Sequence, residues 1–278
     1  MVASLQTVDV ADAAPSAMAQ NAPEPLLSVR GVTVRFGGIV ALNGVSFDIA
    51  AGQIAGLIGP NGAGKTTLFN CMSRLYQPSE GEILFKGQSI LKAPPYAIAG
   101  VGMGRTFQNV ALFDRMSVLD NVKVGCHSAS RAGFVRSVLR LATAQEEARI
   151  TARATELIQF MDLVPFAHYP AGPLPFPIRK RVELARALAG SPSLLLLDEP
   201  AAGLNHDEVD VLKAQIRRVR DLQNVTVLLV EHHMSLVMSV SDKVVAIDFG
   251  KMLAEGTPTE VQNNADVVRA YLGGEAQA

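Results

Sequence analysis

The sequence predicts an α/β fold: a core of parallel strands, an antiparallel β subdomain before it, and an inserted helical subdomain. Short strand-like stretches broken by glycine fill about residues 27 to 58, and the apolar pattern becomes helical between about 115 and 165. After that, strands and helices alternate, in the order LLLLD, HDEVDVLKAQIRRVRDL, VTVLLVE, MSLVMSVS and KVVAIDF. This alternation implies parallel strands with helices on both faces.

The N-terminal part begins with a stretch that we expect to be disordered. Residues 1–25 contain no Lys or Arg and are rich in Ala, Pro, Ser and Gln, which fits neither a secretory signal nor a transit peptide. The expected strands that follow are LLSVRGVTVRF, VSFDIA, QIAGLIG and EGEILFKG. GMGRTFQN then ends a further strand in a polar loop.

The insertion, expected at about residues 110–190, contains one long helical segment, ATAQEEARITARATELIQFMDL, closed by Pro165 and Pro170. The next helix, PIRKRVELARALAG, is amphipathic and stops at Gly190. Its apolar face carries Ile178, Val182, Ala185, Leu188 and Ala189, and Arg179, Lys180, Glu183 and Arg186 are expected elsewhere. We predict one domain over residues 26–273, followed by a tail at 274–278.

Composition excludes several classes of protein. The 278 residues carry a net charge of −1 and are 49% apolar, so no basic field recruits nucleic acid over the whole surface. Cys71 and Cys126 provide neither a disulfide framework nor a metal spacing, and Cys71 is expected to be a small buried hydrophobe. The longest aliphatic run, residues 194–197, is too short to span a bilayer. We expect a cytosolic protein unless a membrane-bound partner holds it.

Residues 59–67 form a phosphate-binding loop between a buried strand and a helix. The nine residues are Gly59, Pro60, Asn61, Gly62, Ala63, Gly64, Lys65, Thr66 and Thr67. Glycines let backbone N–H groups curl around phosphate oxygens, and the positive end of the helix adds to the attraction. Lys65 would bridge the terminal phosphates and Thr66 would bind Mg²⁺. The alternative is a glycine loop that only turns a strand into a helix. The strand before the loop and the helix-competent TLFNCMSRL after it favour the phosphate-binding interpretation. The chain is therefore predicted to bind a nucleoside triphosphate.

A second site element follows the run Leu194 to Leu197, which leads directly into Asp198 and Glu199. A buried strand presenting carboxylates at its C-terminal end can supply the metal ligand and the base of a triphosphate site. We expect Asp198 to hold Mg²⁺ through its water shell and Glu199 to orient the attacking water. Such a pair could instead cap the next helix, but the phosphate loop upstream favours the catalytic interpretation.

Gln108 and His232 each follow a strand, and alone either is an ordinary polar residue. In the order GKTT, Gln108, LLLLDEP and His232, the motifs resemble the ATP-binding cassette (ABC) family, whose core is a P-loop, RecA-like domain. The resemblance implies that Gln108 contacts Mg²⁺ and senses the γ-phosphate, and that His232 steadies the γ-phosphate and the water. It also implies that Phe36 stacks on adenine, with a buried core phenylalanine as the alternative. Asn205 stands where the family usually has Asp.

The resemblance covers roughly residues 27 to 256 and is closest to the ATP-binding subunits of branched-chain amino acid importers and related amide and carboxylate importers. The similar segments are RFGGIVALNGVSFDI, GRTFQNVALFDRMSVLDNV, DEPAAGLN and VEHHMSLVM. It implies an ATPase that uses ATP and Mg²⁺ on the inner face of the cell membrane. Implied partners are polytopic permease subunits, docked at about 109–124, and indirectly an external solute-binding protein, with no nucleic acid.

One motif departs from the family pattern. Where the family carries LSGGQ at a helix start, this chain reads LPFPI, Leu174 to Ile178. Pro175 has no hydroxyl and Pro177 has no N–H, so two donors to a γ-phosphate on a partner subunit are lost. Each such bond contributes on the order of 1.5–3 kcal/mol. We therefore expect a heterodimer with a paralogous ATPase subunit whose signature is intact, although Pro177 is also a good first residue for a helix.

Other classes with this core are weaker candidates. DNA-repair and chromosome-structural ATPases need a coiled-coil or zinc-bearing insertion, and translation-associated cassette proteins carry two cassettes. A regulatory nucleotide-binding module without turnover would not need Glu199. The sequence contains no solute pocket, so it does not distinguish a branched-chain amino acid from urea, a short amide or an aromatic acid.

Overall fold

The fold is described from a computed structural model that covers residues 24–127 and 140–274. The expected N-terminal tail lies outside these residues apart from its last two positions. Gly274, expected to begin the C-terminal tail, is the last residue of a helix. The predicted α/β fold class is confirmed, with one antiparallel and one mainly parallel sheet.

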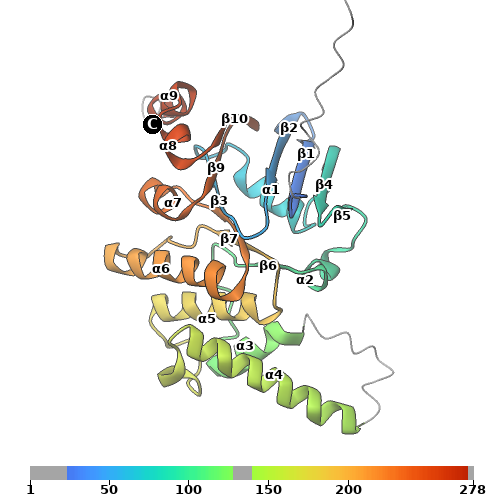
Figure 1. The fold of residues 1–278 in the computed structure, drawn as a ribbon, viewed down its shortest axis with the longest axis vertical. Helices are drawn as coiled ribbons and strands as arrows, with labels where there is room; N and C mark the ends of the chain where they lie inside the picture. The colour runs from blue at the N-terminus through green and yellow to red at the C-terminus, as the bar shows by residue number, and fades with distance from the viewer. Residues whose placement is uncertain (1–23, 128–139, 275–278) are drawn as a thin grey trace, which may run out of the picture.

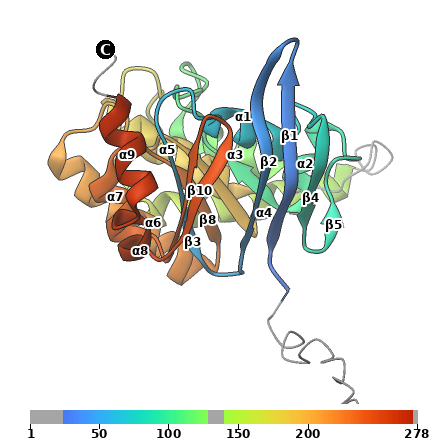
Figure 2. The same cartoon turned by 90° about the horizontal axis from the view of Figure 1, so that it is seen from above.

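The antiparallel sheet has the strand order β2-β1-β4-β5 (Figure 1). Its strands are β1 (Leu27–Phe36), β2 (Ile39–Ile49), β4 (Glu80–Phe85) and β5 (Gln88–Ser89). The strand expected from VSFDIA begins earlier, at Ile39, because pairing with β1 continues past Gly44 through irregular register. Figure 2 shows this sheet on one side of the molecule and helices α6 to α9 on the other.

The second sheet has the order β10-β9-β3-β8-β7-β6. Its strands are β3 (Ile54–Ile58), β6 (Met103–Arg105), β7 (Leu194–Asp198), β8 (Thr226–Val230), β9 (Lys243–Asp248) and β10 (Lys251–Gly256). All neighbouring pairs are parallel except β9 and β10. The antiparallel edge strand β10 was not predicted, because it follows β9 after a tight turn at Phe249 and Gly250 instead of a helix.

The two faces of the parallel sheet are covered differently. Side chains alternate along each strand, so Ile54 and Ile58 of β3 pack among the helices of the insert and α6 and α7. Ala55 and Leu57 instead join a core formed with α1 and the antiparallel sheet. Helices therefore cover both faces as expected, but on the second face α1 shares the core with the antiparallel sheet, which was not expected.

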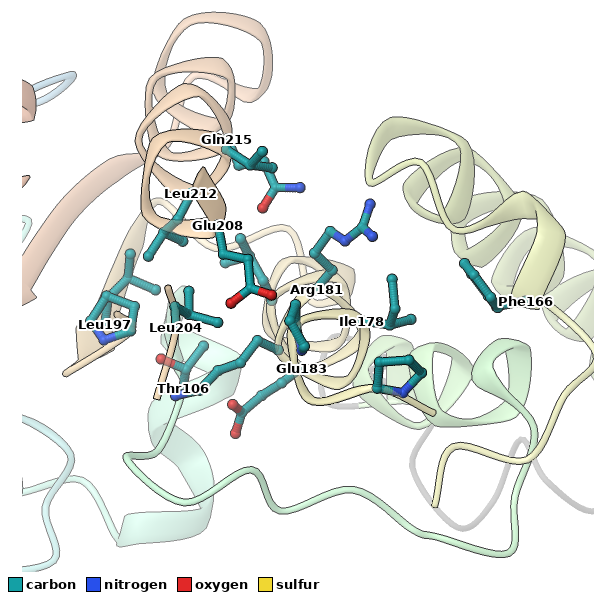
Figure 3. Close-up of a pocket in the computed structure, with 16 residues that line it drawn as sticks. Thr106, Phe166, Ile178, Arg181, Glu183, Leu197, Leu204, Glu208, Leu212 and Gln215 are labelled. Atoms are coloured by element: carbon teal, nitrogen blue, oxygen red, sulfur yellow. The ribbon is translucent and has the colours of Figure 1, made fainter. Parts of the chain in front are cut away.

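The helices follow the predicted order. They are α1 (Lys65–Met72), η1 (Pro95–Ala97), α2 (Ile98–Val101), α3 (Val118–His127), α4 (Arg140–Phe160), η2 (Val164–Phe166), α5 (Phe176–Ala189), α6 (His206–Gln223), α7 (Met234–Val240), α8 (Pro258–Gln262) and α9 (Ala265–Gly274). Helices α3, α4 and α5 gather at the end of the molecule away from the antiparallel sheet (Figure 1). A cavity lies between α5 and the core elements β7 and α6 (Figure 3).

Candidate nucleotide site

The phosphate loop joins β3 to α1 and leaves the start of that helix open. Gly64 is the N-cap at φ 103°, no side chain caps the helix, and its first turn contains no acidic residue. A Cβ at Gly64 would come within 2.7 Å of the Ala41 carbonyl oxygen, and one at Gly59 within 2.1 Å of the Ile247 carbonyl oxygen. Only glycine fits at these two positions, and the exposed backbone N–H groups form a cradle suited to an anion.

Lys65 lies inside this loop. Its side chain is largely buried, and Nζ donates to the carbonyl oxygens of Gly59, at 2.7 Å, and Pro60, at 2.9 Å. Burial lowers the pKa of Lys65, and the charge of Glu199 acts in the opposite direction. The ammonium thus faces neutral carbonyls, which a phosphate could replace with a full negative charge.

The remaining loop residues lie as a phosphate site requires. Asn61 and Gly62 are exposed at the tip of the loop, and Ala63 is buried beneath it. The Thr66 side chain is exposed on the first turn of α1, whereas Thr67 is partly buried. A hydroxyl of this kind, free at the helix start, is available to a metal ion beside the phosphates.

Asp198 ends β7 and is already engaged. Its Oδ2 accepts a hydrogen bond from Arg105 Nη2 at 2.8 Å, and both side chains are largely buried. Arg105 Nη1 also donates to Asn70 Oδ1 and Ser73 Oγ, at 3.0 and 2.8 Å. Arg105 therefore joins β6, β7 and α1 behind the phosphate loop. Sequence reasoning missed this role, although a charged residue in the strand-like GRTF was a signal.

Glu199, Gln108 and His232 are brought together although they are far apart in the sequence. Gln108 Nε2 donates to Glu199 Oε2 at 2.8 Å, and His232 Nδ1 lies 3.9 Å from the same oxygen. Glu199 adopts φ 46°, a left-handed conformation that is unfavourable for a residue with a side chain. Its N–H donates to the Val230 carbonyl of β8, which helps to hold that conformation.

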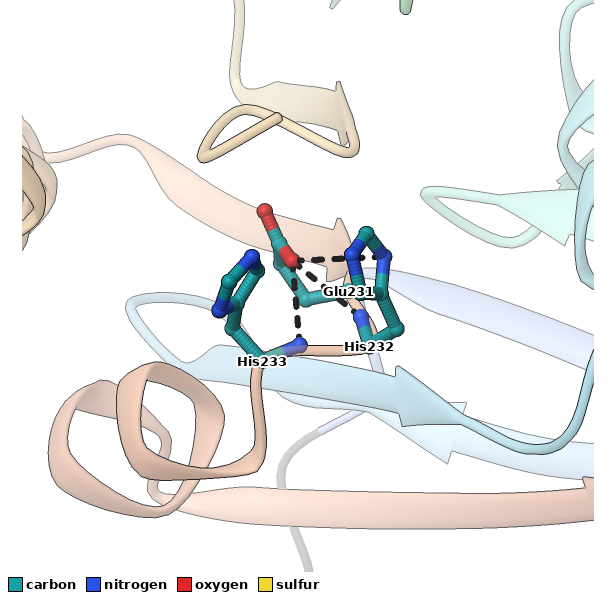
Figure 4. Close-up of side chains that lie close together, drawn as sticks. All are labelled: Glu231, His232 and His233. Carbon is teal, nitrogen blue, oxygen red and sulfur yellow. Dashed lines mark hydrogen bonds and ion pairs between the residues drawn. The ribbon is translucent and has the colours of Figure 1, made fainter. Parts of the chain in front are cut away.

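A buried carboxylate that sequence reasoning missed supports this cluster. Glu231 is fully buried, and its Oε1 accepts the Ala201 N–H at 2.7 Å. Its Oε2 accepts the N–H groups of His232 and His233, at 3.1 and 3.3 Å (Figure 4). Ligand atoms of Glu231, His232 and His233 all lie within 4.8 Å of one another. Because three N–H groups already occupy the carboxylate, we interpret the group as an anchor between the loops after β7 and β8.

The LPFPI segment forms the start of α5. Pro175 is the N-cap, and Pro177 is the second helical residue, not the first. Ile178 and Arg179 both donate their N–H to the Pro175 carbonyl, at 3.0 and 3.1 Å. Of the first three helical residues, only Phe176 therefore keeps a backbone N–H free of this turn. Arg179 is also engaged, since its Nη2 donates to Asp114 Oδ1 at 2.8 Å.

One face of α5 holds the segment that carries Gln108. Glu183, expected on the polar face, is instead only 2% exposed, and its Oε1 accepts the Phe107 N–H at 3.3 Å. Lys180 Nζ donates to the Gln108 carbonyl at 3.4 Å, and Arg186 Nη1 to the Ala111 carbonyl at 2.6 Å. Burial raises the pKa of Glu183 and lowers that of Lys180. Three side chains one turn apart thus fix the backbone of residues 107–111.

Phe36 ends β1 at the surface. Its side chain is 47% exposed, so the alternative of a buried core phenylalanine is wrong. The ring packs edge-on against Tyr76, with centroids 5.2 Å apart. Tyr76, which sequence reasoning did not select, places a second exposed aromatic ring beside Phe36.

The C-terminal helix α9 reaches back to the phosphate loop through Tyr271. Burial raises the pKa of the Tyr271 hydroxyl, the Gly59 N–H acts against this, and Asp248 raises the pKa further. The hydroxyl makes no hydrogen bond of good geometry to the described residues, so its contact with Gly59 is a weak one. Sequence reasoning assigned no role to this helix.

Comparisons with known families give two matches along the chain. The profile of a family described as "ABC transporter" matches residues 42–202. A second, described as "Branched-chain amino acid ATP-binding cassette transporter", matches residues 251–277.

Several curated proteins are similar over most of their length. The chain is 45% identical over 250 residues to the high-affinity branched-chain amino acid transport ATP-binding protein BraF of Pseudomonas aeruginosa, covering 90% of this chain and 98% of that protein. It is 43% identical over 253 residues to LivG of Escherichia coli, a protein of the same description, with the same coverage. Among solved structures, an ATP-binding cassette of an ABC transporter in its ADP conformation superposes with a TM-score of 0.79 at 27% identity, covering 90% of this chain and 100% of that one.

Proposed function

This chain belongs to the ABC transporter family of ATP-binding cassettes, and from that premise we propose that it drives import of branched-chain amino acids or related small amide or carboxylate solutes. It is an ATPase, and ATP is its substrate. The observation that carries the proposal is that one edge of the parallel sheet unites the phosphate loop with Gln108, Asp198, Glu199 and His232. The solute class comes from the names of the similar proteins.

We assign ATP binding to the loop from Gly59 to Thr67. The open N-terminus of α1 receives the phosphates, and Lys65 exchanges the Gly59 and Pro60 carbonyls for phosphate oxygens. Phe36 and Tyr76 offer aromatic surface for the adenine ring.

The residues around the loop also fit Mg²⁺. Thr66, Gln108 and Asp198 would hold it, since a hydroxyl, an amide oxygen and a carboxylate are the oxygen donors that this ion prefers. When bound, Mg²⁺ neutralises negative charge on the phosphates. Arg105 holds the Asp198 carboxylate in place through its hydrogen bond to Oδ2.

Glu199 is our candidate for the base. Its Oε2 accepts a hydrogen bond from the Gln108 amide. To orient water, the carboxylate must release that amide, so the segment holding Gln108 controls when the base becomes available. His232, anchored through the Glu231 carboxylate, lies with its Nδ1 3.9 Å from the same Glu199 oxygen.

The subunit arrangement follows from α5. The start of this helix offers fewer free N–H groups than an ordinary helix start. Pro177 has no N–H, and the Ile178 N–H already donates to the Pro175 carbonyl. We propose that this chain pairs with a paralogous subunit whose signature segment is intact. The phosphate loop of this chain then forms the better of the two composite sites.

The membrane contact is assigned to the segment around Phe113. Among the described residues, none of the helices is long and apolar enough to cross a membrane. Phe107 and Phe113 are about half exposed beside a groove of about 350 Å³ that Val124 also lines. Buried Asn121 fixes the loop below, bonding the Phe113 N–H and the carbonyls of Phe113, Met116 and Ser117. We propose that a polytopic permease docks here, with this subunit on the inner face of the cell membrane and an external solute-binding protein acting through the permease.

The experiment is co-purification followed by reconstitution into liposomes. The membrane protein that co-purifies with this chain should support ATP-dependent uptake of labelled leucine, isoleucine or valine. Lys65→Ala should abolish uptake, whereas Lys92→Ala, which changes an exposed lysine, should not. Uptake of a different solute would overturn the solute assignment. Co-purification with a nuclease or with ribosomes, and no permease, would favour a non-transport ATPase.

A further inference from the structure

A cavity of about 470 Å³ separates the insert from the core, and the site described above does not use it. One wall comes from the insert, with Phe166 and Ile178, and the other from β7 and α6, with Leu197, Leu204 and Leu212 (Figure 3). This volume is in the range of small-molecule pockets. Mostly aliphatic walls favour an apolar ligand body.

Two buried polar atoms in this cavity have no partner. Thr106 and Gln215 are 6% and 5% exposed, and Thr106 Oγ1 and Gln215 Nε2 make no hydrogen bond to any residue that the structure describes. Buried polar groups are usually satisfied, so an orphaned hydroxyl and an orphaned amide N–H in one cavity indicate a missing partner. The amide nitrogen only donates, so that partner must include a hydrogen-bond acceptor.

The charges select the kind of acceptor. Arg181 lines the same cavity as Gln215 (Figure 3), and within residues 24–127 and 140–274 it has no hydrogen bond or ion pair. The other charged groups are committed: Lys180 to the Gln108 carbonyl, Glu183 to the Phe107 N–H and Glu208 to the Asn205 N–H. A guanidinium and an amide N–H that line one cavity are together suited to a carboxylate.

We propose that this cavity binds a small aliphatic carboxylate, with its carboxylate on Arg181 and Gln215 and its apolar body among the leucines of β7 and α6. Such a ligand would touch α5 and α6 together. It would therefore stabilise one placement of the insert, including the LPFPI segment, relative to the core. The carboxylate could come from an amino acid or from a simple acid without an ammonium group. The two differ because the negative charges of Glu208 and Glu183 would attract the ammonium group that only the amino acid carries.

The test is titration of the full-length chain, labelled at Ile and Leu methyl groups, followed by NMR. The probes are 4-methylpentanoate, leucine and the neutral 4-methylpentanamide. We expect saturable shifts at Ile178, Leu204 and Leu212 with at least one of the two carboxylates and much weaker shifts with the amide. Tighter binding of leucine would identify amino acids as the ligands, and tighter binding of 4-methylpentanoate would identify acids without an ammonium group.

Matched variants test the assignment of donors. Arg181→Met and Gln215→Leu should each weaken binding about tenfold or more, whereas Arg149→Met, an exposed arginine elsewhere on the insert, should not. Gln215→Leu should also raise the melting temperature of the ligand-free chain, because it removes an orphaned amide. Absence of saturable shifts with either carboxylate, equal binding of the amide, or unchanged binding by Arg181→Met would overturn the proposal and leave a cavity that holds only water.

Discussion

Two side chains to which the sequence analysis gave no role, Arg105 and Glu231, hold residues of the predicted site and its neighbouring loop. Arg105 binds Asp198 from behind the phosphate loop, and Glu231 binds the N–H groups of Ala201 and His232. Both are charged groups placed where charge is costly to bury unless it is well paired. Their cost in stability is consistent with a role in placing the carboxylates and the histidine of the site.

Glu199→Gln tests the proposed base. Glutamine still accepts the hydrogen bond from Gln108 but cannot take a proton, so nucleotide affinity should be retained and ATP turnover should fall about a hundredfold or more. Steady-state hydrolysis by the reconstituted complex is the measurement. Glu82→Gln, an exposed residue of β4, serves as the control. Turnover within a few-fold of the unmodified complex would remove Glu199 from this role.

Arg105→Met tests the support of Asp198. Removing one partner of a buried ion pair leaves an uncompensated charge, which typically costs about 3–5 kcal/mol of unfolding free energy. Arg35→Met, which breaks an exposed pair with Glu80, should cost at most about 1 kcal/mol.

Urea unfolding with and without Mg-ADP distinguishes this role from a purely structural one. Because bound Mg²⁺ would compensate the Asp198 carboxylate, Mg-ADP should stabilise Arg105→Met more than it stabilises the unmodified chain. Equal stabilisation of both chains would mean that Asp198 does not face the metal.

At the scale of elements, α5 connects the signature segment to the segment that carries Gln108. Lys180, Glu183 and Arg186 each bind a backbone group within residues 107–111, so the two elements should move as a unit. The sequence could not reveal this. Glu183 appears polar and therefore exposed, and only the path of residues 107–111 over α5 shows that it is buried.

Glu183→Leu and Glu183→Gln test whether the contact between α5 and residues 107–111 depends on a hydrogen-bond acceptor at position 183. Leucine leaves the partly buried Phe107 N–H without its side-chain acceptor, at a cost of up to about 1–3 kcal/mol, whereas glutamine keeps an acceptor. We expect the leucine variant to weaken stimulation of ATP hydrolysis by the permease while nucleotide affinity is retained, and the glutamine variant to be close to normal. Stimulated and basal rates, measured side by side, check this. Equal stimulation in both variants would show that the contact only contributes to stability.

At the scale of the molecule, the order of strands and helices in the core could be predicted, because hydrophobic periodicity and glycine breaks determine it locally. The antiparallel edge strand β10 and the packing of the antiparallel sheet on the core could not, because both depend on contacts between distant segments. The same distinction holds in the site. Gln108, Glu199 and His232 were found by motif, whereas Arg105, Glu231 and Tyr76 are recognised only by what they contact.

The docking prediction changes once the contacts are known. Charge reversal at Asp114 or Asp120 is the test that the sequence suggests, but Asp114 pairs with Arg179 and Asp120 bonds Ser117 at the start of α3. Such reversals would disturb the insert itself.

Phe113→Ala is the more specific test of docking, since the Phe113 ring is half exposed while its backbone is held by Asn121. It should reduce co-purification of the permease without changing ATP binding, and Leu222→Ala, exposed on α6, should do neither. Full recovery of the permease with Phe113→Ala would place the docking surface elsewhere.

The altered signature makes a prediction about the whole dimer. If the start of α5 lacks donors for a partner's γ-phosphate, hydrolysis depends on the partner's signature segment and little on this one. Replacing the partner's signature serine by alanine should then nearly abolish turnover, whereas Pro175→Ala here should change it little. The Phe176 ring lies so near Gly203 that a Cβ there would come within 3.0 Å of it, so Phe176→Ala would confound packing with donor loss and is the poorer test. Steady-state ATPase rates of the two single-subunit variants decide the matter. Comparable losses in both would mean that backbone donors at this helix still reach the phosphate, and that the two composite sites are equivalent.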